Sequence, residues 1–150
     1  MIKNLKYSEL IDRFGQPGDV SHMVKIRFPF SLYLGGDRSV QCNNFYGHKY
    51  IANSVIDAFT EIMDIFGIEF IRKHGLDEYG GCFNNRLSRG STRPSVHAWG
   101  LAIDYLPHLG QLGEPPLTPF HVVNAFTKRG FLWGGNWSRS DGMHFSSVIE

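Results

Sequence analysis

Two short polar segments that lie far apart in this 150-residue chain constrain its fold most strongly, because their side chains suit one shared site. The first runs from Ser95 to Asp104 and contains His97, and the second runs from Asp141 to His144. Two imidazoles and one carboxylate form the ligand set of an open zinc site, which leaves a second carboxylate for proton transfer. The fold must therefore bring the two segments together.

The cysteines argue against a closed structural zinc site. Such sites usually complete the metal's tetrahedron with thiolates, whereas Cys42 and Cys82 are not paired at ligand spacing. A site with three protein ligands keeps a fourth position for water and lowers the pKa of that water towards ~7. We therefore expect a catalytic type of site, and two free, buried thiols.

Local backbone patterns allow these side chains to converge. A strand over residues 101–106 would present Asp104 on one face. His97 reaches the same metal only if the chain bends between them, and Gly100 is placed to permit that bend. Gly142 can likewise turn the chain so that both acidic and imidazole groups of the second segment face one site. The residues alone do not decide which carboxylate binds the metal and which serves as the base.

Together the two segments resemble the zinc D-alanyl-D-alanine carboxypeptidase-like peptidases, which include phage L-alanyl-D-glutamate endolysins and D-alanyl-D-alanine dipeptidases. The family's signature is Ser-x-His-x-x-Gly-x-Ala-x-Asp, followed by an acidic residue three positions before a second His. The resemblance covers roughly residues 48–147 and is weaker before them. The matching residues of this chain are Ser95, His97, Gly100, Ala102, Asp104, Asp141 and His144.

The resemblance implies a role for each polar residue of the signature. It assigns His97, Asp104 and His144 to Zn²⁺. It assigns Asp141 to general base catalysis, in which this carboxylate takes the proton of the attacking water and later delivers it to the leaving amine.

Three further residues are expected to contact the substrate or its transition state. Residues 80–86 resemble the strand that carries the family's active-site Arg, and this match selects Arg86 over two neighbouring arginines. A fixed guanidinium there would stabilise the negative charge that develops on the attacked carbonyl oxygen. In the resemblance Ser95 faces the substrate, although capping of a turn is also open to it. Of the three tryptophans, we expect Trp137 at the wall of the cleft.

Two positions depart from the family's usual pattern. Asp141 and Ser146 stand where many relatives carry Glu. The shorter Asp reaches about one methylene less, so the geometry at the water must differ from that of relatives with Glu. These departures keep open a second hypothesis, in which the chain is a non-catalytic zinc-containing module that binds the cell wall.

The preferred interpretation is a zinc peptidase that hydrolyses a bond in the stem peptides of bacterial peptidoglycan. Gly81, Asn84 and Arg86, together with the segment 97–100, look most like the phage endolysin branch, which cleaves the L-alanyl-D-glutamate bond. D-alanyl-D-alanine carboxypeptidase or dipeptidase activity is the alternative within the same family.

Charge and hydropathy exclude other classes of partner. The net charge is +1 and no run of Lys and Arg is present, which argues against a nucleic-acid or anionic-membrane surface. No apolar run approaches the length of a membrane span, and residues 1–6 are not followed by a signal-type apolar core. We expect synthesis in the cytoplasm, action on the bacterial cell wall after release, and indirect dependence on a holin-type permeabilising partner, as for phage-encoded lysins.

The remaining patterns predict one α+β domain over residues 1–150, with a mostly antiparallel central sheet flanked by helices. The resemblance implies the same hedgehog/D-Ala-D-Ala peptidase-like fold. Helical periodicity is clearest over residues 48–66, and alternation predicts a strand over 24–28 that Pro29 stops or confines to an edge. The other predicted elements are helices over 7–14, 68–74 and 119–128, strands over 30–34, 80–86, 131–133 and 143–148, and a loop beside the site over 107–119, flanked by His108 and His121.

Overall fold

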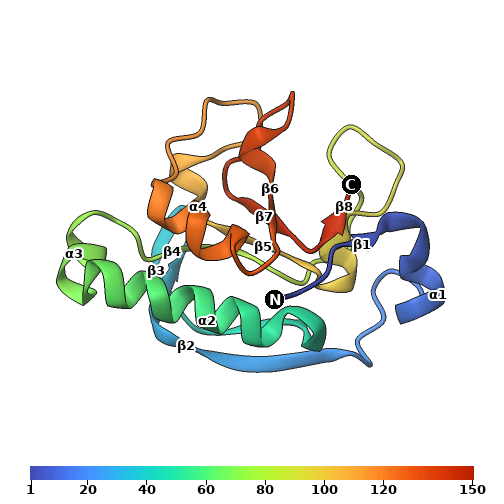
Figure 1. Cartoon of the computed structure of the whole chain (residues 1–150), viewed down its shortest axis with the longest axis horizontal. Helices are drawn as coiled ribbons and strands as arrows, with labels where there is room; N and C mark the ends of the chain where they lie inside the picture. Colours follow the sequence, from blue (N-terminus) through green and yellow to red (C-terminus); the bar gives the residue numbers. More distant parts are fainter.

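A six-stranded sheet forms the centre of the computed structural model, which describes all residues from Met1 to Glu150. Its strands are β2 (Met23–Leu34), β3 (Asp37–His48), β4 (Glu78–Gly81), β5 (Ala102–Tyr105), β6 (Leu132–Trp133) and β7 (His144–Ser146). They lie in the order β3-β2-β4-β5-β7-β6, and only the β2–β4 pair is parallel. The predicted α+β domain with a mostly antiparallel sheet and flanking helices is confirmed (Figure 1).

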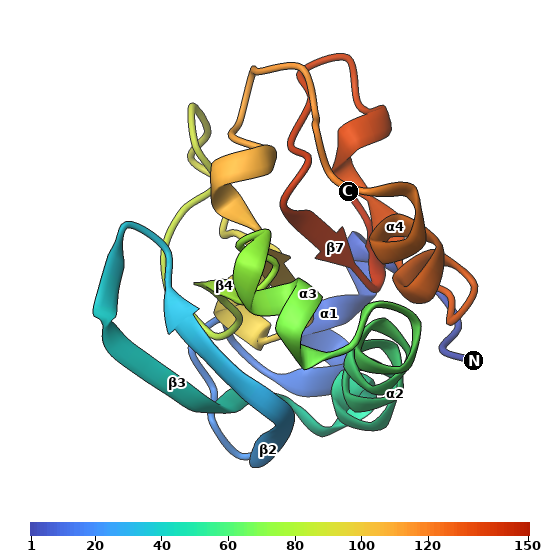
Figure 2. The ribbon, with the colours of Figure 1, turned by 90° about the vertical axis from the view of Figure 1, so that its left-hand side faces the viewer.

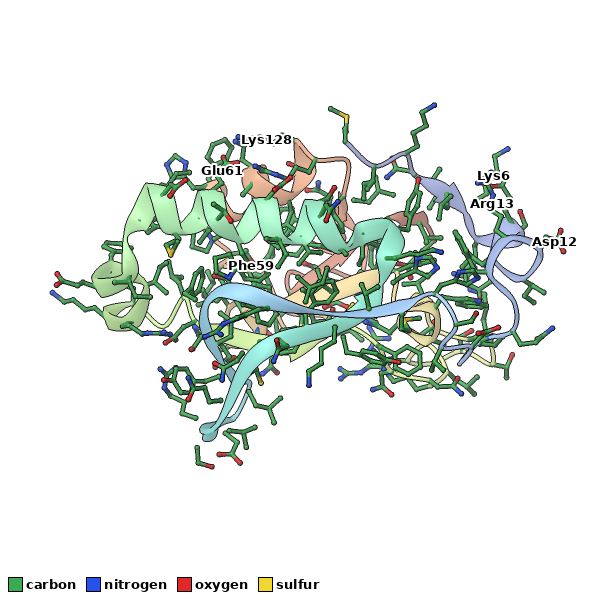
Figure 3. All side chains as sticks on the ribbon, turned by 90° about the horizontal axis from the view of Figure 1, so that it is seen from below. Lys6, Asp12, Arg13, Phe59, Glu61 and Lys128 are labelled. Carbon is green, nitrogen blue, oxygen red and sulfur yellow. The ribbon has the colours of Figure 1, made fainter.

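Helices cover one side of this sheet. The longest, α2 (Lys49–Phe66), packs against β2 and against α4 (Phe120–Thr127), and Figure 2 looks nearly along its axis. Its apolar residues recur at steps of three and four, so that one face is buried. Phe59 points from α2 into the core, where its ring contacts those of Phe28 and Tyr105 (Figure 3). The short helix α3 (Ile68–Lys73) follows a break at Gly67, as predicted.

The β2–β3 hairpin differs from the prediction. β2 does not stop at Pro29, because the ladder with β3 is irregular between Arg27 and Leu32 and this irregularity accommodates a residue without an N–H. β3 was not predicted at all. Its residues are mostly polar and exposed, so no alternation marks them as a strand. The turn at Gly35–Gly36 was the available signal for a hairpin here.

The strand predicted over residues 80–86 is also wrong at its C-terminal end. β4 ends at Gly81, whose φ of 122° lies in the region that favours glycine. The chain then leaves the sheet, and the carbonyl of Cys82 turns towards the ring of His97, whose Nδ1 lies 2.7 Å away. The backbone N–H of Asn84 donates to the carbonyl of the same histidine over 2.9 Å. These two contacts attach the residues after β4 to the first polar segment.

A separate pair of short strands joins residues near the two ends of the chain. β1 (Leu5–Lys6) lies parallel to β8 (Val148–Ile149), as Figure 1 shows beside the terminus marked C. The predicted helix over residues 7–14 forms as a short 3-10 turn, η1 (Tyr7–Glu9), followed by α1 (Leu10–Phe14).

No helix is long and apolar enough to cross a membrane.

Both cysteines are free thiols, as expected, but only Cys82 is fully buried, since Cys42 lies on the exposed strand β3.

Candidate active site and metal centre

Neighbouring strands bring two of the three predicted ligands side by side. In the antiparallel β5–β7 pair, Asp104 lies directly opposite His144, so both side chains project from the same face of the sheet. The third ligand, His97, comes from the short 3-10 turn η2 (Val96–Trp99), which precedes β5. The two polar segments therefore meet as the sequence required.

The three side chains form a nearly equilateral triangle of donor atoms. His97 Nε2 lies 3.2 Å from Asp104 Oδ1 and 3.2 Å from His144 Nδ1, and the third side, between His144 Nδ1 and Asp104 Oδ1, is 3.1 Å. Ligands about 2.0–2.1 Å from a tetrahedral zinc ion are separated by roughly 3.3 Å, so a triangle of this size could hold such an ion.

Each histidine is oriented by a partner on its other ring nitrogen. The Nδ1 of His97 lies 2.7 Å from the carbonyl of Cys82, and the Nε2 of His144 lies 2.8 Å from a carboxylate oxygen of Glu150. When these nitrogens donate, the nitrogens in the triangle keep their lone pairs for a metal, an arrangement that is common at metal-binding histidines.

Glu150 was not predicted as part of the site from the sequence. It lies outside the family signature, and nothing local marks it as part of a site. The position where relatives carry Glu is Ser146, which is buried and bonds to the backbone of Val148 instead. In this chain a carboxylate four residues further along the sequence contacts His144.

The charges of the triangle favour a bound cation. Burial would raise the pKa of Asp104, but His97 and His144 hold it well below its usual range, so the carboxylate is ionised. Burial would lower the pKa of His144, but hydrogen bonds to Asp104 and Glu150 raise it to about 10. The pocket thus stabilises positive charge between its carboxylates, and a metal would compete with a proton for it.

Asp141 stands beside the triangle with one oxygen free. Its Oδ1 is buried without a hydrogen-bond partner, and its backbone N–H is held by the carbonyl of Gly134 over 2.9 Å. Burial is the main cause that raises the pKa of this carboxyl above its ordinary value. A carboxylate with a raised pKa and an unused oxygen is suited to accept a proton.

Gly100 and Gly142 shape the two segments in different ways. Gly100 has a φ of 63°, and a side chain there would approach His48 N to 2.8 Å, so it forms the predicted bend. Gly142 lies in the predicted turn, in which the N–H of His144 donates to the carbonyl of Asp141 over 3.1 Å, and it makes this turn without a positive φ. It is needed for close packing, because a Cβ would lie 2.7 Å from the side chain of Pro116 and 2.9 Å from the backbone of Gly110.

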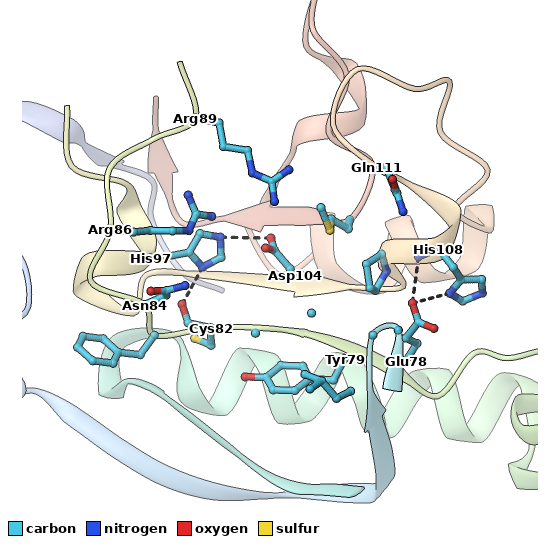
Figure 4. A pocket seen from close by; sticks show the side chains of 18 residues that line it. Glu78, Tyr79, Cys82, Asn84, Arg86, Arg89, His97, Asp104, His108 and Gln111 are labelled. Carbon is cyan, nitrogen blue, oxygen red and sulfur yellow. Dashed lines mark hydrogen bonds and ion pairs between the residues drawn. The ribbon is translucent and has the colours of Figure 1, made fainter. Parts of the chain in front are cut away.

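Two arginines face the triangle instead of one. Arg86 is held near His97 because its carbonyl accepts the N–H of Ser95 over 2.9 Å. Arg89 extends towards Asp104 from above in Figure 4, and its charge acts on the pKa of Asp141. The sequence match selected Arg86 alone, so Arg89 is a second candidate for the cationic group.

Ser95 and Trp137 both lie at the site. The hydroxyl of Ser95 accepts the N–H of His97 over 3.3 Å and so caps η2, which is the alternative role considered from the sequence. Trp137 is about one third exposed, and its ring centre lies 5.2 Å from that of His144. The expected position of Trp137 at the cleft wall agrees with this geometry.

Two hollows meet at the triangle. The larger hollow has a volume of about 520 Å³ and runs from His97 and Asp104 over β4 towards Glu78 and His108 (Figure 4). The smaller hollow, of about 200 Å³, contains all three candidate ligands. Its other lining residues include Arg86, Arg89, Ser95, Trp137, Arg139, Asp141 and Glu150.

Comparison with known proteins identifies one related family. Residues 89–147, which contain every member of the triangle and Asp141, match the family model described as D-alanyl-D-alanine carboxypeptidase. Searches of curated proteins and of solved structures gave no significant match. Peptidases of this family are metal-dependent, and the triangle of His97, Asp104 and His144 could hold a metal ion. The match covers less than half of the chain, and it includes all the residues of the triangle.

Proposed function

We propose that this chain is a zinc-dependent peptidase that hydrolyses a stem-peptide bond of bacterial peptidoglycan, and that its preferred bond is L-alanyl-D-glutamate. The triangle of His97, Asp104 and His144 beside the free oxygen of Asp141 is the observation that carries this proposal. The family match over residues 89–147 supports the peptidase class.

The donor set fits zinc better than a hard cation. Two imidazole nitrogens and one carboxylate oxygen are typical ligands of catalytic zinc, whereas magnesium and calcium prefer oxygen alone. Zinc at such a site lowers the pKa of water towards ~7 and polarises a carbonyl group. His97, Asp104 and His144 would hold it, and the contacts of the two histidines with Cys82 and Glu150 would keep their rings oriented.

The protein's own residues then supply proton transfer and charge stabilisation. Asp141 accepts the proton of the attacking water and returns it to the leaving amine, a role that its unpartnered oxygen and raised pKa suit. Arg86 or Arg89 stabilises the oxyanion, because a fixed guanidinium at the site gains most where negative charge develops. No covalent enzyme intermediate is required.

The shape of the cleft favours an endopeptidase. Both hollows contain His97 and Asp104, so a substrate chain can extend from the triangle in two directions. A carboxypeptidase needs space for only one terminal residue beyond the scissile bond. The description of the matching family favours the alternative, a D-alanyl-D-alanine carboxypeptidase or dipeptidase.

Mass spectrometry of digested muropeptides tests the proposal. The zinc-loaded protein is expected to generate peptides with a new N-terminal D-glutamate, and a chelator is expected to abolish their formation. Release of terminal D-alanine would favour the alternative bond. Binding to cell walls without any new product, with or without zinc, would favour the non-catalytic binding module.

The proposed substrate also suggests where the chain acts. Peptidoglycan lies outside the bacterial cytoplasm, so an enzyme that acts on it must cross the cytoplasmic membrane. A holin-type permeabilising partner would then give the enzyme access to the wall. Lysis of intact cells only when such a partner is co-expressed would support this route.

A further inference from the structure

We propose that the far end of the larger hollow is a subsite for a cationic amino group of the substrate, and that Glu78 selects it. The inference rests on the proposed function, because a substrate reaches this end only by lying across His97 and Asp104. The proposed amino group is the one on the side chain of a diamino acid residue in the stem peptide.

The floor of the larger hollow is built to receive an extended chain. Gly80 and Gly81 of β4 present no side chains, and a Cβ at Gly80 would lie 2.8 Å from the Cβ of Asp104. Gly81 pairs with Asp104 across the sheet, and Glu78 lies three residues earlier on β4. At 3.2–3.4 Å per residue in a strand, Glu78 is about 10 Å from the level of the triangle. A long side chain one or two residues beyond the scissile bond can span that distance.

Glu78 is held in place with one oxygen available. Its Oε1 accepts the backbone N–H of His108 over 3.0 Å and lies 3.0 Å from the Nδ1 of the same residue, as the dashed lines of Figure 4 show. Its Oε2 makes no hydrogen bond within the protein, and the side chain is only 14% exposed. The adjoining turn is fixed by Leu106, a buried residue with a φ of 58°. The carboxylate is therefore preorganised for a further donor.

Cationic side chains lie at one part of the cleft only. Arg86 and Arg89 line both hollows beside the triangle, and Arg139 lines the smaller hollow, where a carboxylate of the substrate could pair with an arginine that Asp141 and Glu150 leave free. At the far end of the larger hollow Glu78 is the carboxylate, and no Lys or Arg lies beside it among the lining residues. A peptide with a carboxylate near the scissile bond and an ammonium group further along matches this pattern in one orientation only. Complementary charge of this kind gives specificity.

A purely structural role for Glu78 makes a different prediction. If the carboxylate only anchors the turn at His108, its removal changes stability and leaves the choice between substrates unaltered. If it binds an ammonium group, its removal changes the choice between substrates. The experiment therefore compares two peptides on the same protein.

The two probes are stem tetrapeptides that differ only at the side-chain amino group of the diamino acid, which is free in one and acetylated in the other. The zinc-loaded wild type should cleave the free-amine peptide with a kcat/KM roughly tenfold higher, the size expected for one well-placed charge pair. Glu78→Gln should reduce this ratio to about one, and Glu78→Asp should give an intermediate ratio. Equal ratios in the wild type and Glu78→Gln would overturn the proposal.

A matched control separates the subsite from a general charge effect. Glu69 is exposed on α3 and lines neither hollow, so Glu69→Gln removes the same charge and should keep the wild-type ratio. Loss of the ratio in Glu69→Gln as well would contradict a local site. Thermal unfolding of each variant reports whether it is folded.

Binding of the same probes distinguishes failure of this inference from failure of the proposed function. Affinities are measured by calorimetry on the Asp141→Ala protein with and without Glu78→Gln. Selective binding of the free amine that depends on Glu78, together with a zinc-loaded wild type that cleaves no stem peptide, would support the subsite and overturn the peptidase. Cleavage with no dependence of rate or affinity on Glu78 would overturn the subsite alone.

Discussion

The chain contains two pairs of closely spaced histidines, and only one pair resembles a metal centre. The rings of His97 and His144 lie 5.0 Å apart, and those of His22 and His48 lie 5.2 Å apart, so the spacing of the imidazoles is nearly the same. One histidine of each pair has a shifted pKa, and the two shifts have opposite directions. The pKa of His144 is raised to about 10, whereas burial, His22 and Lys49 lower that of His48 to about 4.

The difference lies in the groups around each pair. Asp104 sits between His97 and His144, and the outer nitrogens of both rings have oxygen partners. Neither histidine of the other pair forms an ion pair with a carboxylate, and the ring of Phe14 packs against His48. Two ring nitrogens, His22 Nδ1 and His48 Nε2, are buried without any hydrogen-bond partner. Two imidazoles in contact are therefore not enough for a candidate metal site. Such a site also needs the carboxylate between the rings and the hydrogen bonds on their outer nitrogens.

The contrast between the two histidine pairs is tested most directly by removing one carboxylate of the site at a time. Asp104→Ala should lose zinc during dialysis and lose activity with it, because the triangle then has only two ligands. Asp141→Ala should keep zinc and fold normally, but its rate should fall by ~10²–10⁴ through loss of general acid–base catalysis. Zinc content by atomic absorption and the rate of wall lysis measure both effects.

If the Asp141 variant lost zinc and the Asp104 variant retained it, the roles assigned to the two carboxylates would be reversed. His48→Asn serves as the control from the other histidine pair, and it should leave the zinc content at the wild-type value because His48 does not belong to the triangle.

Removing an outer partner should have a smaller effect. Glu150→Gln keeps the size of the side chain but removes the charge that orients His144, so zinc affinity should fall about 10–100-fold. Competition with a chromogenic chelator measures the change. Glu114→Gln, at an exposed position, should leave affinity unaltered. An unchanged affinity in Glu150→Gln would show that the contact with His144 has no influence on the metal.

The second histidine pair, His22 and His48, should make the stability of the fold depend on pH. The ordinary pKa of His48 is 6.5 and its folded value is about 4, so the unfolded chain binds more protons between these values. Stability is then full above pH 6.5 and falls as the pH is lowered towards 4, by on the order of 2 kcal/mol between pH 7 and pH 5. Denaturant unfolding at both pH values measures this loss.

His48→Asn should flatten that dependence. The Nδ1 of His48 accepts the N–H of Tyr50 at the start of α2, and Asn can provide the same cap without a titrating group. The slope of stability against pH is the relevant quantity, because the lost ring contacts lower the absolute stability of the variant. A slope equal to that of the wild type would assign the acid sensitivity to other groups.

The smallest effect is expected at Ser95. Its hydroxyl caps η2, the turn that carries His97, so Ser95→Ala should lower the free energy of unfolding by about 1 kcal/mol. Thermal unfolding and steady-state kinetics together separate its two possible roles. A raised KM at unchanged stability would support the substrate contact implied by the family resemblance and contradict the cap as its main role.

How much the sequence predicted depends on whether a residue's role is local. The helix over residues 48–66, the bend at Gly100 and the convergence of the two polar segments follow from spacing and from glycine, and they were predicted. The end of β4 at Gly81 was not, because it depends on a distant partner, the ring of His97, for the carbonyl of Cys82. Glu150 was missed for the same reason, since only the folded chain places it beside His144.

The parallel pairing of β1 with β8 has a consequence for how the protein folds. It joins Leu5 to Val148 and so closes nearly the whole chain into one loop. Closing a loop of this length costs more conformational entropy than any local contact, and contacts of such long range tend to form slowly. Because Glu150 directly follows β8, the orientation of His144 would be completed only at this late step. A refolding chain would then acquire its helices well before it acquires its full affinity for metal.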